Sequence, residues 1–149
     1  MTTGGAAQTW FVVGAIPLLL AGGLHALLTL IDTVRPTFFA PVDPSVVRSA
    51  EGTGVRFVRM FGGGERSSMW SMWLGMHVSH GLGAFTFALV LLLVATHDFA
   101  LIGDVGGLRA VTIVVPALYC ALSLRFWFYL PSLVTGAATA CFAISALTA

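Results

Sequence analysis

The stretch MWSMWLGMHVSHGLGAFTFALVLLLVAT, Met69–Thr96, decides the fold class of this chain. It is long enough to cross a bilayer, because about 20 apolar residues, each rising about 1.5 Å, span the hydrocarbon core. Its first half nevertheless contains two tryptophans and two histidines, which are Trp70, Trp73, His77 and His80. The stretch therefore predicts a membrane helix that carries titratable rings along part of its length.

Three further apolar runs surround this stretch, at about Trp10–Ile31, Leu108–Leu124 and Pro131–Thr148. Of the 149 residues, 58% are hydrophobic and only 9% are charged, whereas soluble domains are about 25% charged. Such a chain lacks the polar side chains to cover a water-facing surface. The sequence predicts an all-α fold, an integral membrane four-helix bundle, with residues 1–149 forming a single membrane domain.

Several classes of function have no support in the sequence. The net charge is +1 with no basic run, so no nucleic-acid partner is expected. Cys120 and Cys141 lie in apolar runs without a C-x-x-C motif, which is typical of small core residues. No nucleophile elbow is present, and GGGER, residues 62–66, lacks the Lys-Ser/Thr pair of a phosphate-binding loop. Hydrolytic chemistry is therefore not expected.

The arginines predict the orientation in the membrane. Only Arg109 lies on one side of the four runs, and six arginines lie on the other. Cytoplasmic loops are enriched in arginine and lysine, so the loop Asp32–Ser68 is expected in the cytoplasm. Both termini are then outside a bacterial inner membrane. The six arginines are Arg35, Arg48, Arg56, Arg59, Arg66 and Arg125.

The long loop contains an amphipathic segment, at about residues 44–61. Asp43 followed by Pro44 is a favourable helix start. At helical spacing, apolar residues from Val46 to Phe61 gather on one side and arginines on the other. This pattern is typical of a helix that lies in the membrane interface. The glycines Gly52 and Gly54 weaken the pattern, and an irregular loop packed under the bundle is the alternative.

Histidines from two neighbouring helices are expected at similar depth. His25, Thr29 and Asp32 follow the spacing i, i+4, i+7 on the first helix. Asp32 marks the cytoplasmic end, so His25 lies roughly 10 Å inside it. His77 and His80 lie roughly 6 to 10 Å below interfacial tryptophans on the second helix. Because a histidine facing lipid is costly, these rings are expected to face the bundle and one another.

Four interpretations of this cluster stay open. The histidines can bridge helices by hydrogen bonds, since buried polar groups need partners. They can ligate haem iron, with His25 and His77 or His80 as the axial pair. They can hold a non-haem metal ion through His25, His77 and His80, with an oxygen from Asp32. They can also bind or protonate a lipophilic molecule such as a quinone or an isoprenoid.

The candidate ligand contacts begin with His25 and His80, followed by His77 and Asp32. Two of the remaining candidates are hydroxyl side chains beside the histidines, Thr29 and Ser79. The others border the expected entrance to the pocket at the membrane interface, namely Trp70, Trp73 and Arg125.

Three stretches resemble a family of small, uncharacterised bacterial four-helix membrane proteins. They are GLHALLTLID (Gly23–Asp32), PTFFAPVDP (Pro36–Pro44) and MWSMWLGMHVSHGLGAF (Met69–Phe85), and the last contains the family's W-x-x-W-x-G-x-x-x-S-H-G block. The resemblance implies a fold but no activity. Because the family often has asparagine where this chain has His77, it favours His25, Ser79 and His80 as site residues.

The sequence thus predicts a small membrane protein whose intramembrane histidine pocket binds a lipophilic or redox-active ligand near the cytoplasmic leaflet. The alternative is a non-catalytic accessory or structural subunit of a larger membrane complex. The partner expected in the membrane is then another membrane protein or a second copy of this chain. Small residues on the last helix, such as Gly136, Ala137 and Ala140, suit such packing. A proton-conducting or transport role is the third hypothesis.

Overall fold

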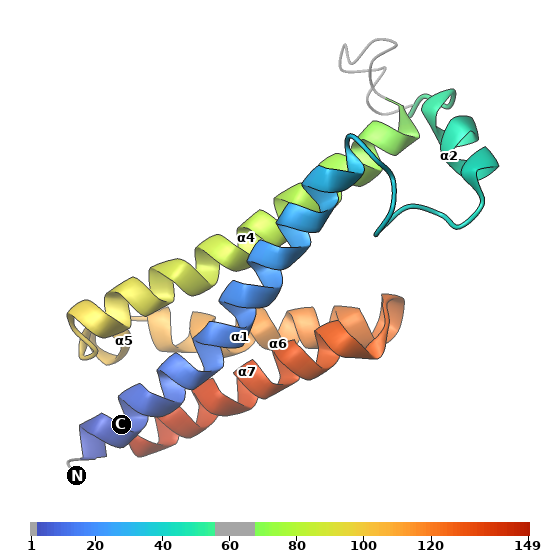
Figure 1. The fold of residues 1–149 in the computed structure, drawn as a ribbon. Helices are drawn as coiled ribbons and strands as arrows, with labels where there is room; N and C mark the ends of the chain where they lie inside the picture. The colour runs from blue at the N-terminus through green and yellow to red at the C-terminus, as the bar shows by residue number, and fades with distance from the viewer. Residues whose placement is uncertain (1–2, 56–67) are drawn as a thin grey trace. The chain divides into compact units, whose positions relative to one another are not determined.

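The structure is a computed structural model that describes residues 3–55 and 68–149. Within these residues the chain forms six α-helices and no strand, so the all-α prediction is confirmed (Figure 1). The helices are α1 (Thr3–Asp32), α2 (Pro44–Glu51), α4 (Met69–His97), α5 (Leu101–Asp104), α6 (Leu108–Phe126) and α7 (Tyr129–Thr148).

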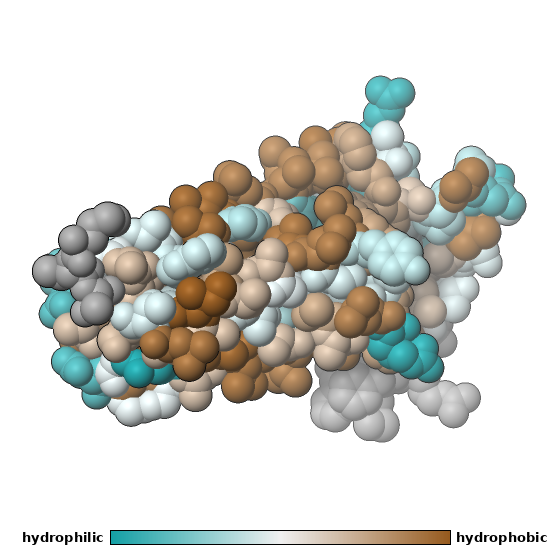
Figure 2. All heavy atoms as spheres, turned by 90° about the horizontal axis from the view of Figure 1, so that it is seen from below, coloured by the Kyte–Doolittle hydropathy of each residue, from teal (hydrophilic) through white to brown (hydrophobic). Residues whose placement is uncertain are grey.

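Four of these helices, α1, α4, α6 and α7, are long and apolar enough to cross a membrane. Large apolar side chains on them, such as Leu20, Leu24 and Leu93, are exposed on the protein. Much of the face shown in Figure 2 is accordingly hydrophobic. Because exposed leucines are favourable in lipid and unfavourable in water, the protein is a multi-pass membrane protein.

The helices extend beyond their predicted bounds. Helix α1 begins at Thr3 rather than near Trp10, because its first turns contain alanine and no proline to interrupt the backbone hydrogen bonds. Helices α6 and α7 leave only Trp127 and Phe128 between them. Pro131 lies in the first turn of α7, where its missing N–H costs no helical hydrogen bond.

The described residues divide into two compact units. Of the described residues, unit 1 contains residues 3–21 and 84–149, and unit 2 contains residues 22–55 and 68–83. Helices α1 and α4 therefore each contribute residues to both units.

Unit 1 is held by a small aromatic and alanine core. Phe11 and Phe142 are almost fully buried, and their ring centroids lie 4.9 Å apart. Small residues allow the backbones to approach, as at Gly14, where an added Cβ would lie 2.8 Å from the Cβ of Cys141. The buried hydroxyl of Ser145 donates to the carbonyl of Ala7 at 2.8 Å, which joins α7 to α1.

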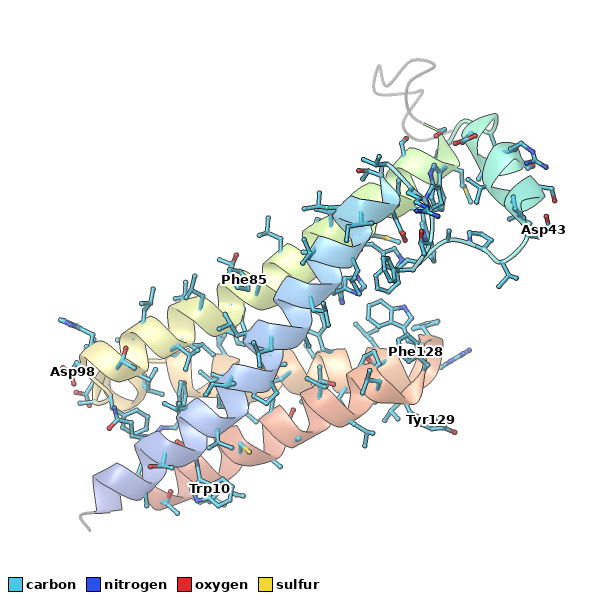
Figure 3. The ribbon with its side chains drawn as sticks, viewed as in Figure 1. Trp10, Asp43, Phe85, Asp98, Phe128 and Tyr129 are labelled. Carbon is cyan, nitrogen blue, oxygen red and sulfur yellow. The ribbon has the colours of Figure 1, made fainter. Side chains whose placement is uncertain are left out.

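Helix α2 in unit 2 begins as its sequence predicts. The carboxylate of Asp43, which is labelled in Figure 3, accepts a hydrogen bond from the backbone N–H of Ser45 at 2.8 Å, and Pro44 occupies the first turn. The helix ends at Glu51 and is followed by Gly52, so it is shorter than the predicted segment 44–61. The apolar positions at 57–61 and Arg56 and Arg59 lie outside the described residues.

The buried face of α2 packs against the start of α4. Val47 forms a cluster with Trp70 and Leu74, whereas Val46 is exposed. The N–H of Met69 donates to the carbonyl of Thr53 at 2.7 Å, and Gly54 pairs with Ser68. These contacts place the end of α2 beside the first turn of α4.

The start of α4 is capped by a side chain. The hydroxyl of Ser68 accepts the N–H of Ser71 at 3.1 Å. Serine at this position satisfies one of the unpaired donors of the first helical turn.

Candidate functional site

Unit 2 brings three imidazoles together from the facing halves of α1 and α4. The Nε2 atom of His25 lies 3.2 Å from the Nδ1 atom of His77. The ring centroids of His25 and His77 are 5.2 Å apart, and those of His25 and His80 are 5.7 Å apart. All three rings are half-buried. His25 is thus the central ring of the cluster.

Two further aromatic rings in unit 2 contact the histidines. The ring centroid of Phe39 lies 4.5 Å from that of His25 and 5.4 Å from that of His77. The ring centroid of Trp73 lies 4.4 Å from that of His77, and its indole N–H donates to the carbonyl of Phe39 at 3.1 Å. We call His25, His77, His80, Phe39 and Trp73 the histidine cluster.

Asp32 holds the loop that delivers Phe39. Its Oδ1 atom accepts the backbone N–H groups of Thr37 and Phe38 at 2.8 and 2.9 Å, and its Oδ2 atom accepts that of Phe39 at 2.6 Å. The residue is fully buried. A buried carboxylate needs such charge-assisted hydrogen bonds to offset its lost hydration. Asp32, predicted as a ligand contact, therefore acts as an anchor for the loop.

Gly81 sets the distance between the two helices beside the cluster. A Cβ atom on Gly81 would lie 2.7 Å from the backbone nitrogen of Ala26 and 3.0 Å from the carbonyl oxygen of Gly22. Only glycine allows this approach, because the opposing atoms belong to the backbone of α1 and have no rotamer to change. The approach places His77 and His80 within reach of His25.

The two hydroxyls predicted beside the histidines bond to their own helices. Thr29 is fully buried and donates to the carbonyl of His25 at 2.8 Å. Ser79 is exposed and donates to the carbonyl of Met76 at 3.0 Å. Such bonds to the preceding turn are common for serine and threonine in helices. In these positions neither hydroxyl proton points toward the cluster.

Two other sequence candidates, Trp70 and Arg125, have contacts of their own within their units. Trp70 packs against Val47 and Leu74 under α2. Arg125 belongs to unit 1, where its guanidinium carbon lies 5.1 Å from the ring centroid of Phe126, in the last turn of α6. Neither residue is among those that unit 2 gathers around His25.

The cluster offers two facing nitrogens rather than a complete metal site. Among residues 3–55 and 68–149, no group of three or more histidine, cysteine, aspartate or glutamate side chains is arranged to hold a metal ion. Ligation of haem iron by a pair of axial imidazoles, as the sequence predicted, places the two rings on opposite faces of the macrocycle. The rings of His25 and His77 are stacked at 30° and touch directly, which is a different arrangement.

Sequence reasoning did not identify Phe39 as a member of the cluster. The feature of the sequence that could have pointed to Phe39 is the loop Pro36–Pro44 directly after Asp32, because one carboxylate there can bind three successive N–H groups.

No family model, curated protein or solved structure matches this chain.

Proposed function

We propose that the histidine cluster binds a small lipophilic molecule with a polar head, of the quinone or isoprenoid type, and exchanges a proton with it. The observation that carries this proposal is the 3.2 Å contact between His25 Nε2 and His77 Nδ1. We further propose that the cluster lies near the cytoplasmic leaflet of a bacterial inner membrane, which the arginine distribution supports. We also propose that the chain belongs to the resembled family, which the block from Trp70 to Gly81 supports.

The contact between His25 and His77 suits acid–base chemistry. A neutral imidazole has one donor and one acceptor nitrogen, whereas an imidazolium ring has two donors. At least one of the two rings must therefore be neutral for the contact at 3.2 Å to be a hydrogen bond. A proton that arrives at the pair changes which nitrogens donate, as required of a group that exchanges protons with a bound molecule.

The surroundings of the cluster favour a lipophilic partner. The three imidazoles are half-buried on helices that cross the membrane, and Trp73 is 42% exposed. A molecule dissolved in the bilayer reaches such a surface without crossing water. Phe39 and Trp73 suit a ligand with a planar ring as its head, such as a quinone. Such a ring packs against aromatic side chains in offset or edge-on contacts.

The direct test is a titration of the purified full chain in mild detergent with decylubiquinone, followed by tryptophan fluorescence. Quenching is expected because Trp73 contacts His77. His25→Gln and His77→Gln are expected to weaken binding by about five- to thirtyfold, as for loss of a buried hydrogen bond. The matched control is His97→Gln, which changes an exposed histidine in the last turn of α4.

Equal affinity in His25→Gln and His97→Gln would show that the quinone does not use the cluster. Lipid extracted from the protein should then be checked for an enriched isoprenoid. A Soret band or a bound metal ion, lost in His25→Gln, would instead establish the haem or metal hypothesis. Co-purification of a stoichiometric protein, without any bound lipophile, would establish the accessory-subunit hypothesis.

A further inference from the structure

A cavity of about 310 Å³ lies within unit 1. Its walls come from α1, α5, α6 and α7 and from the turn that precedes α5. The volume is at the lower end of the range for small-molecule sites. The turn and α5 connect two membrane-spanning helices, so this part of the cavity lies at a membrane surface.

The interior of the cavity is aromatic. Phe11, Phe99 and Phe142 line it, with the Phe11 ring centroid 5.7 Å from that of Phe99 and 4.9 Å from that of Phe142. The buried hydroxyls of Thr112 and Ser145 also line it, but both already donate to backbone carbonyls. The interior therefore suits an apolar group.

The mouth of the cavity carries one charge of each sign. Asp104 and Arg109 both line it, and both are exposed. They form no salt bridge with each other in the described part of the chain. The guanidinium of Arg109 lies over Gly103, where an added Cβ would be 2.6 Å from Nη2. The two charges thus stand apart on the rim of an aromatic cavity.

We infer that this cavity binds a zwitterionic phospholipid, with its phosphate on Arg109, its ammonium group on Asp104 and its apolar part against Phe99, the ring of the three that is only partly buried. Guanidinium binds phosphate through paired hydrogen bonds, and carboxylate or an aromatic face binds ammonium. An anionic lipid would place a second negative charge beside Asp104. The position at the membrane surface is where lipid headgroups are found.

Native mass spectrometry of the full chain with equimolar phosphatidylethanolamine and phosphatidylglycerol tests this inference. The wild type is expected to retain phosphatidylethanolamine about two- to fivefold better, the scale of an exposed charge pair. Arg109→Gln is expected to lower retention of both lipids, and Asp104→Asn to remove the preference. The matched control is Arg125→Gln, which removes an exposed arginine from the other end of α6.

Gly103→Ala provides a second variant that keeps every charge. Its Cβ displaces the Arg109 guanidinium, and retention of both lipids is expected to fall as in Arg109→Gln. Soluble phosphoethanolamine at the lipid concentration is expected not to displace the lipid, because it lacks the apolar part. Displacement by that compound, equal retention of the two lipids by the wild type, or identical behaviour of Arg109→Gln and Arg125→Gln would overturn the inference.

Discussion

Gly81→Ala should separate the two helices that carry the histidine cluster. The new Cβ would lie 2.7 Å from the backbone nitrogen of Ala26, and contacts under 3.4 Å are tighter than nearly all real ones. The helices must therefore move apart by about 0.7 Å. A shift of that size along the line from His25 Nε2 to His77 Nδ1 lengthens their 3.2 Å contact to about 3.9 Å. That distance is beyond hydrogen bonding.

The energetic cost follows from three terms. Overpacking between close-packed elements costs about 1–3 kcal/mol, and a lost interhelical hydrogen bond in a membrane protein costs about 0.6 kcal/mol. Alanine gains about 1 kcal/mol over glycine in a helix. Gly81→Ala is therefore expected to destabilise the protein by about 0.6–2.6 kcal/mol.

The assay is reversible unfolding of the full chain in mixed micelles, combined with NMR of the histidine ring nitrogens. Gly75→Ala and Gly83→Ala are matched controls on the same helix, because an added Cβ at either position meets nothing within 4 Å. Both are expected to be neutral or slightly stabilising. If Gly81→Ala unfolds like these controls, with unchanged ring signals for His25 and His77, the close-approach argument is wrong.

Asp32→Asn should release the loop beside the cluster, because an amide has one acceptor oxygen where the carboxylate receives three N–H groups. A cost of about 1–3 kcal/mol is expected, together with faster amide exchange at Phe39; unchanged exchange would contradict the anchoring role. The hydrogen bond from the Ser45 N–H holds the pKa of Asp43 below its usual range. The stabilisation of α2 is therefore present above about pH 4 and is lost as the pH falls through the lowered pKa of Asp43. NMR of α2 during acid titration should show this loss, and Asp43→Ala should abolish the pH dependence. Finally, alkaline phosphatase fused to the C-terminus should be active and green fluorescent protein dark; the reverse result would overturn the predicted orientation.

Much of the fold follows from local chemistry that the sequence contains. Four apolar stretches of membrane length predict four helices, because lipid forces every backbone N–H and carbonyl to be paired within a segment. Capping works at the same short range, so Asp43–Pro44 predicts the start of α2. Interactions within one turn depend only on neighbouring residues, and this is why they are readable in advance.

The cluster itself is only partly predictable. Helical spacing places His25 on one helix and His77 and His80 on another, but spacing carries no distance between helices. The 3.2 Å contact between His25 and His77 depends on the backbone approach at Gly81, which is a property of two segments.

The sequence by itself determined that this chain is a helical membrane protein with histidines inside its spans. Tertiary structure alone decided what the polar groups around them do. Asp32 anchors the loop through hydrogen bonds, and Phe39 joins the cluster, because the chain reverses after α1. Ser79 bonds to its own helix and faces outward. The physical reason is that each donor takes the nearest acceptor in space, and the fold determines which acceptor that is.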